Sequence, residues 1–195
     1  MLYNKILHYL WPRSLLLLTL ANLLSAITIG PSFAESKDIC RNFSVQPKTF
    51  AGLKFVNTKQ YENRDYGVFI KFGVRNQILS IFKYDSGQTN ISDKFLQQRL
   101  ESSRLSIEKA TAKRDDDIIE RGAPFVWKIG EVLFYGVSYH VTRKKHNLTS
   151  FEYVGLSHNT ACMLKVRYTD ALKTGSAMSL KRYKSYTKEA HELFE

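Results

Sequence analysis

The chain has 195 residues, of which 44% are hydrophobic and 13% aromatic, and its formal net charge at pH 7 is +11. This length and composition provide for one ordinary domain with an apolar core. The sequence contains no internal repeat, low-complexity tract or linker-like stretch, which excludes repeat arrays and chains of linked domains.

The N-terminal segment has the pattern of an export signal. Lys5 and Arg13 precede an apolar run that ends at Ile29 and is followed by small residues up to Ala34. The run is shorter than the roughly 20 residues that span a bilayer. We therefore predict a secretory signal peptide over residues 1–34, cleaved between Ala34 and Glu35. The alternative is an uncleaved segment that tethers the domain to a membrane.

Without this segment the chain has 27 basic and 18 acidic residues, a charge of +9. A strongly basic exported protein attracts anionic partners, such as an acidic protein or an anionic envelope surface. Nucleic acid is not expected outside the cell. The other interpretation is solubility, because most lysines are scattered along the chain. Two basic clusters stand out, and each is either a solvated face or a docking site: Arg143, Lys144 and Lys145, and residues 181–184.

The exported part has two cysteines, Cys40 and Cys162. In an oxidising compartment an even pair usually forms a disulfide. Such a bond would close a loop of about 120 residues, which is worth roughly 4 to 5 kcal/mol in the chain-entropy model. Two separate thiols or a metal site are the alternatives. Zinc is disfavoured because the chain has no CxxC pair and no nearby histidine pair.

In chain order, residues 35–52 are expected to be irregular, and a single α+β domain is expected over residues 53–195. Alternating β-branched and aromatic residues predict a hairpin with strands at 66–72 and 78–84, after an edge strand that begins at Leu53. Apolar residues at helical spacing then predict a long amphipathic helix from Asp93 to about Lys113.

The second half begins with a charged break at residues 113–117. The clearest strand follows at 131–142, where apolar and polar residues alternate. Segments 150–156 and 161–169 continue an antiparallel meander, and residues 176–194 form the final helix. We therefore predict an α+β sandwich in which an antiparallel sheet of about five to six strands packs with two main helices.

This order of elements resembles the PsbP-type α/β/α sandwich, which includes the DcrB lipoproteins, a Ran-binding nuclear transport factor and the PsbP subunit of photosystem II. The strand Ile78–Tyr84, its Asp85–Gly87 turn and the following Asn90–Asp93 also resemble uncharacterised secreted bacterial proteins. The resemblance covers about Phe50 to Phe194. It implies a binding or assembly role and a bacterial source, and it brings no catalytic signature.

The sequence carries few motifs that indicate a specific chemistry. The sequence has no nucleophile elbow, P-loop, HExxH or GxGxxG motif. His140, Glu152 and His158 could form a hydrolase or ligand-binding site across the meander, because paired strands bring side chains on one face to within about 5 Å. The simpler interpretation is ordinary strand and turn histidines. No metal or cofactor is expected.

The leading prediction is an exported protein, periplasmic or secreted, that acts without catalysis in binding or in envelope assembly. Its partner would be a protein or an anionic envelope surface. The alternatives are an exported hydrolase or ligand-binding enzyme at His140, Glu152 and His158, and a membrane-tethered domain that retains its N-terminal segment.

Overall fold

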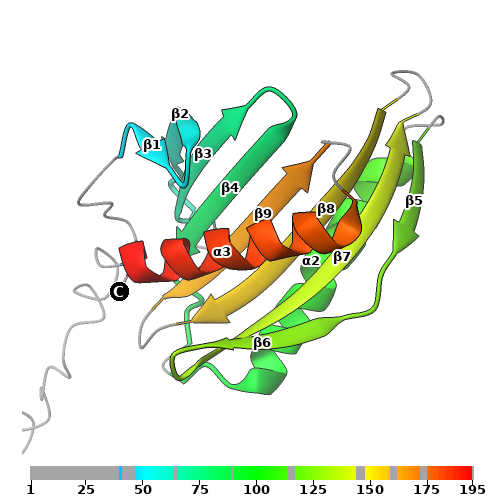
Figure 1. Cartoon of the computed structure of the whole chain (residues 1–195). Coiled ribbons are helices and arrows are strands. Elements are labelled where there is room, and N and C mark those ends of the chain that lie inside the picture. Colours follow the sequence, from blue (N-terminus) through cyan, green and yellow to red (C-terminus); the bar gives the residue numbers. More distant parts are fainter. Residues whose placement is uncertain are drawn as a thin grey trace, which may run out of the picture. The chain divides into compact units, whose positions relative to one another are not determined.

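A large antiparallel sheet lies between two helices (Figure 1). The computed structural model describes residue 40 and residues 47–63, 66–88, 90–113, 117–143, 148–158, 162–171 and 175–194. The predicted signal peptide, the Ala34–Glu35 cleavage site, Lys144 and Lys145 lie outside these ranges. All of the described residues belong to one compact unit. Within them, no helix is both long and apolar enough to cross a bilayer.

Among the described residues, nine strands and two helices follow one another along the chain. The strands of the N-terminal half are β1 (Thr49–Phe50), β2 (Leu53–Gln60), β3 (Val68–Val74) and β4 (Gln77–Tyr84), and the helix α2 (Asp93–Ala112) follows them. The C-terminal half contains β5 (Asp117–Arg121), β6 (Phe125–Ile129), β7 (Val132–Arg143), β8 (Leu148–His158), β9 (Met163–Asp170) and the helix α3 (Ser176–Phe194).

The sheet order is β1-β2-β3-β4-β9-β8-β7-β5, and β6 also pairs with β7. The order joins the N-terminal hairpins to the C-terminal meander through the β4–β9 pair, in which Ser80 lies opposite Arg167 and Phe82 opposite Lys165. This long-range pair makes one sheet of the two halves of the chain.

The predicted α+β class, with an antiparallel sheet and two main helices, is confirmed. The predicted number of strands is too low, because the described residues form nine. Phe125–Ile129, left unassigned from the sequence, is a strand that pairs with β7. Thr49–Phe50 is a strand within the segment expected to be irregular, and Asp117–Arg121 is a strand that begins at the end of the expected charged break. These last two are short, show little alternation of their own, and are held as strands by pairing with longer neighbours.

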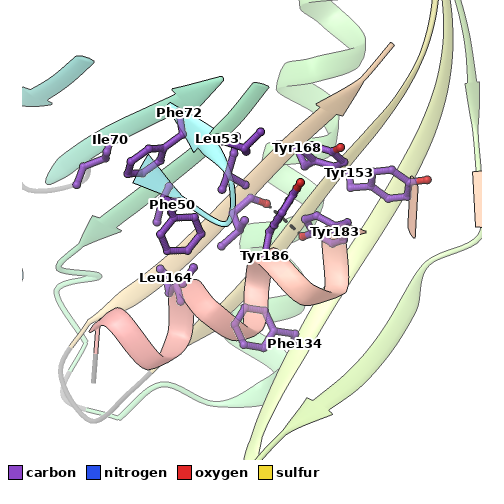
Figure 2. Packing of buried hydrophobic residues seen from close by; sticks show 14 of the residues in the cluster. Phe50, Leu53, Ile70, Phe72, Phe134, Tyr153, Leu164, Tyr168, Tyr183 and Tyr186 are labelled. Carbon is purple, nitrogen blue, oxygen red and sulfur yellow. Dashed lines mark hydrogen bonds between the residues drawn. The ribbon is translucent and has the colours of Figure 1, made fainter. Parts of the chain in front are cut away.

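The α3 side of the sheet holds the main core (Figure 2). Tyr183 of α3 is fully buried, stacks on Tyr153 with ring centroids 5.1 Å apart, and donates a hydrogen bond of 3.2 Å to the Val166 carbonyl. Gly155 makes this approach possible, because a Cβ there would lie 2.3 Å from the Tyr183 hydroxyl oxygen. The glycine in the strand therefore sets how closely α3 approaches the sheet.

The other face is covered in part by α2, which contacts β5, β7 and β8. The helix begins after Ser92, whose side-chain oxygen accepts a hydrogen bond of 3.2 Å from the Phe95 amide. Leu96 of α2 is fully buried against this face. Because α2 lies mainly over β5, β7 and β8, it leaves part of β4 and β9 on this face uncovered.

The disulfide prediction is confirmed, because Cys40 and Cys162 are joined with a Cα–Cα distance of 5.6 Å. Both residues are buried, and the bond connects positions 122 residues apart. Cys162 lies directly before β9, so the bond ties the N-terminal part of the domain to a central strand.

Candidate anion-binding groove

Two adjoining hollows lie on the α2 side of the sheet. The first, with a volume of about 400 Å³, lies between α2 and strands β4, β9 and β8, and we call it the α2 hollow. The second, of about 500 Å³, continues over β3, β4 and β9, and we call it the open hollow. They share four lining residues, so together they form one groove, called the basic groove below: Phe82, Arg143, Glu152 and Arg167.

Strand register explains why charged side chains line this groove. Along β9, Leu164, Val166 and Tyr168 enter the α3-side core, so Lys165 and Arg167 between them face the α2 side. Pairing with Ser80 and Phe82 of β4 places them at the floor of the groove. The alternation that builds the core on one face therefore builds the groove on the other.

The centre of the groove is a three-residue ion-pair group. The Arg143 guanidinium lies 2.6 Å from one carboxylate oxygen of Glu152, and the Arg167 guanidinium lies 2.8 Å from the other. Arg143 also donates a hydrogen bond of 3.1 Å to the Ser150 hydroxyl. Only 3% of the Glu152 side chain is exposed, against 42% for Arg167. One buried carboxylate thus fixes two guanidiniums, and the Arg167 side chain reaches solvent.

Lys165 adds a further cation beside this group. Its ammonium nitrogen lies 4.9 Å from the centre of the Phe82 ring, a cation–π contact. No carboxylate of the described chain lies within ion-pair distance of it. Burial lowers the pKa of the Lys165 ammonium below its usual value, and the charge of Arg167 lowers it further. An anion in the groove would therefore stabilise the charged form of this lysine.

Charge in the groove is strongly unbalanced. Arg99 of α2 lines the α2 hollow, and Lys71 and Arg75 line the open hollow. Glu152 is the single carboxylate among the described lining residues. Opposite it stand six cationic side chains: Lys71, Arg75, Arg99, Arg143, Lys165 and Arg167. A concave site with an excess of positive charge concentrates anions and can bind them through several guanidinium donors.

The structure does not bring His140, Glu152 and His158 together. Glu152 lies opposite Tyr139 in the β7–β8 pair, so His140, the next residue, faces the other side of the sheet. There His140 stacks on Phe151 at 5.1 Å, and its Nδ1 lies 3.2 Å from a Glu120 oxygen. His158 is six residues along β8 from Glu152, or roughly 20 Å. The structure therefore does not place these three side chains around one pocket, because His140 faces the other side of the sheet and His158 is too distant.

The predicted basic cluster contributes one residue to the groove. Arg143 lines it, whereas Lys144 and Lys145 lie outside the described residues. Sequence reasoning missed Lys165 and Arg167, although their spacing of two within a strand was a usable signal. It also missed Arg99, because the sequence of a helix does not show which strands the helix packs beside. No cluster of three metal-ligating side chains occurs within the described ranges.

Comparisons with known proteins add a likeness of fold. No family model matches the chain, and no curated protein matches it. The chain is similar to the solution structure of cyanobacterial PsbP (CyanoP) from Synechocystis sp. PCC 6803, with a TM-score of 0.42 and 10% sequence identity. The match covers 68% of this chain and 79% of that chain. At this identity the match is one of fold alone.

Proposed function

We propose that this is an exported, non-enzymatic binding protein that holds an anionic partner in the basic groove. The observation that carries the proposal is the excess of six cationic side chains over one carboxylate in a continuous concave surface. The partner is an acidic protein segment or an anionic envelope surface, since both present the charge that this groove lacks.

Binding is favoured over catalysis by the state of the groove's carboxylate. Both Glu152 oxygens are engaged by guanidinium groups at 2.6 and 2.8 Å, so this side chain holds the two arginines in place. The other charged groups lining the groove donate hydrogen bonds and provide positive charge. Those are the properties that position an anion, and they do not by themselves activate a nucleophile.

Export is supported by the N-terminal sequence pattern and by the disulfide. A bond between Cys40 and Cys162 persists in an oxidising compartment, such as a periplasm or the extracellular space. N-terminal sequencing of the mature protein tests this part of the proposal. A new N-terminus at Glu35 is expected, whereas a retained Met1 would favour the membrane-tethered alternative.

The binding experiment uses two probes, a glutamate-rich peptide and vesicles containing phosphatidylglycerol, each titrated at low and high salt. The groove variant is Lys71→Glu with Arg99→Glu, which reverses charge at two positions outside the Arg143–Glu152–Arg167 group. Its matched control is Lys181→Glu with Lys184→Glu, which makes the same charge change at exposed positions of α3.

We expect at least one probe to bind the wild type, and to bind more weakly at high salt because exposed charges are screened. The groove variant should weaken that binding about tenfold or more, equal to about 1.4 kcal/mol, and the control by less than about twofold. The probe that binds then identifies the class of partner. Equal losses in both variants, or no binding of either probe, would overturn the proposal.

A further inference from the structure

The basic groove also contains apolar surface, which a site for simple charge neutralisation would not need. Phe82 and Tyr84 of β4 line the α2 hollow, and Tyr66 lines it with 59% of its surface exposed. The hollow's volume of about 400 Å³ lies within the range of roughly 300–1,000 Å³ typical of small-molecule sites. Its size and lining therefore suit a molecule with both polar and apolar parts.

Strand register separates these two parts along the groove. Tyr84 lies opposite Met163, Phe82 opposite Lys165, and Ser80 opposite Arg167. From the Tyr84 row to the Ser80 row is four residues, or roughly 13 Å. One end of the α2 hollow is therefore aromatic, and the other is formed by guanidinium groups held by Glu152.

The helix side of the hollow is kept open by small residues. Ser102, Ser103, Ser106 and Ala110 of α2 line it, where larger side chains would fill the space. Ser102 and Ser106 donate hydrogen bonds of 3.0 and 2.9 Å to carbonyls of their own helix, so these hydroxyls satisfy their donors locally. These small residues thus supply room, while the charge comes from Arg99 of the same helix and from the sheet.

We infer that the ligand of the α2 hollow is a single amphiphilic anion, about one nanometre long, with a phosphate, sulfonate or carboxylate group at Arg143 and Arg167 and an apolar body beside Phe82 and Tyr84. This inference rests on the proposed function, because it uses cations of the same basic groove, and it adds to the partners proposed above a small ligand recessed between helix and sheet.

The test compares three probes by calorimetry or fluorescence. The complete probe is 8-anilinonaphthalene-1-sulfonate, which combines a sulfonate with aromatic rings. N-phenyl-1-naphthylamine supplies the rings without the charge, and methanesulfonate supplies the charge without the rings. We expect the complete probe to bind at least about tenfold more tightly than either part, because only it contacts both ends of the hollow.

The variant Ser106→Trp fills the hollow from an exposed helix position without removing a charge. Its matched control is Leu105→Trp at the neighbouring position, which is 53% exposed and does not line the hollow. We expect Ser106→Trp to weaken the complete probe about tenfold or more and Leu105→Trp to change it by less than about twofold. Circular dichroism confirms that both variants fold.

The failures of the two proposals are distinguishable. If Ser106→Trp leaves the complete probe unaffected, or if either half-probe binds as tightly as the whole, the amphiphile inference is overturned. The proposed function survives that result if the peptide or the vesicles still bind in a manner sensitive to Lys71→Glu with Arg99→Glu. If neither of those probes binds, the proposed function itself fails.

Discussion

The two faces of strands β4 and β9 differ sharply, although alternate residues of the same two strands form them. On the α3 side, Leu79, Ile81, Val166 and Tyr168 are all 0% exposed. On the α2 side, the alternating positions hold Ser80, Phe82, Lys165 and Arg167, which line the groove. The difference arises from the covering helix, since α3 crosses β8 and β9 while α2 lies over β5, β7 and β8 (Figure 1).

In this pair of strands, one face mainly contributes to stability and the other to the proposed binding. The α3 face buries large aromatic side chains, which dominate the free energy of folding. The α2 face leaves charges and aromatic edges accessible beside the helix. Substitutions on the α3 face should therefore unfold the protein, and those on the groove face should mainly change what it binds.

The largest effect is expected from Tyr183→Ala on the α3 face. The variant removes a fully buried ring and its hydrogen bond to Val166, and leaves a cavity beside Trp127 and Tyr153. We expect the free energy of unfolding to fall by about 3–5 kcal/mol, measured by urea denaturation. The control Tyr66→Ala, on the groove side, should change it by less than about 0.5 kcal/mol. Similar losses in the two variants would contradict the separation of the faces.

Removing the disulfide should cause the next largest loss of stability, and it should affect the two faces of the sheet equally. Cys40→Ser with Cys162→Ser frees a bond that spans 122 residues of sequence. We expect a loss of about 2–4 kcal/mol in unfolding free energy, and the same loss when the wild type is reduced. Affinity for the groove probes should stay unchanged while the protein remains folded. If the free energy of unfolding did not change when the wild type is reduced, a stabilising role for the bond would be refuted.

Glu152→Gln should lower stability and raise affinity together. The amide leaves the two guanidiniums without their buried negative partner, which should cost about 1–3 kcal/mol of unfolding free energy. The groove gains one net positive charge, so anionic probes should bind a few-fold more tightly. The control Glu131→Gln alters a side chain that is 94% exposed and should change neither quantity. A parallel fall in both would show that Glu152 only maintains the fold.

At pH 7 the smallest effect is expected from the buried tyrosine hydroxyls, and it grows at alkaline pH. Burial raises the pKa of Tyr139 to about 12, and burial also raises the pKa values of Tyr168 and Tyr183. The native tyrosines therefore keep protons that the unfolded chain releases above pH 10, its usual tyrosine value. Stability should be unaffected by these groups below pH 10 and should fall as the pH rises from 10 to 12.

Absorbance at 295 nm, recorded during denaturation at several pH values, measures this release of protons. Tyr139→Phe is the informative variant, because the Tyr139 hydroxyl is buried without a hydrogen-bond partner among the described atoms. Its loss should change stability at pH 7 by less than about 1 kcal/mol and should flatten the decline above pH 10. An unchanged slope would mean that Tyr139 ionises similarly in the folded and unfolded chains.

Local sequence patterns predicted much of the fold. The alternation of β7 and β9 and the helical spacing of α2 and α3 were visible because each element repeats its own period. The short strands β1 and β5 were missed because pairing with a neighbour, rather than their own residues, makes them strands. His140 was misplaced for a related reason: adjacent strands bring side chains together only when their parity matches.

By itself, the sequence determined the α+β class, the two amphipathic helices, the meander and the cysteine pair, because these follow from periodicity and composition over short stretches. Only the tertiary structure decided that β4 lies beside β9, where Gln77 donates a hydrogen bond to Tyr168, 91 residues later. It also decided that α2 leaves these strands partly uncovered, which turns scattered cations such as Arg99, Arg143 and Arg167 into one groove. Contacts between distant segments depend on how whole elements pack, and no local period encodes that arrangement.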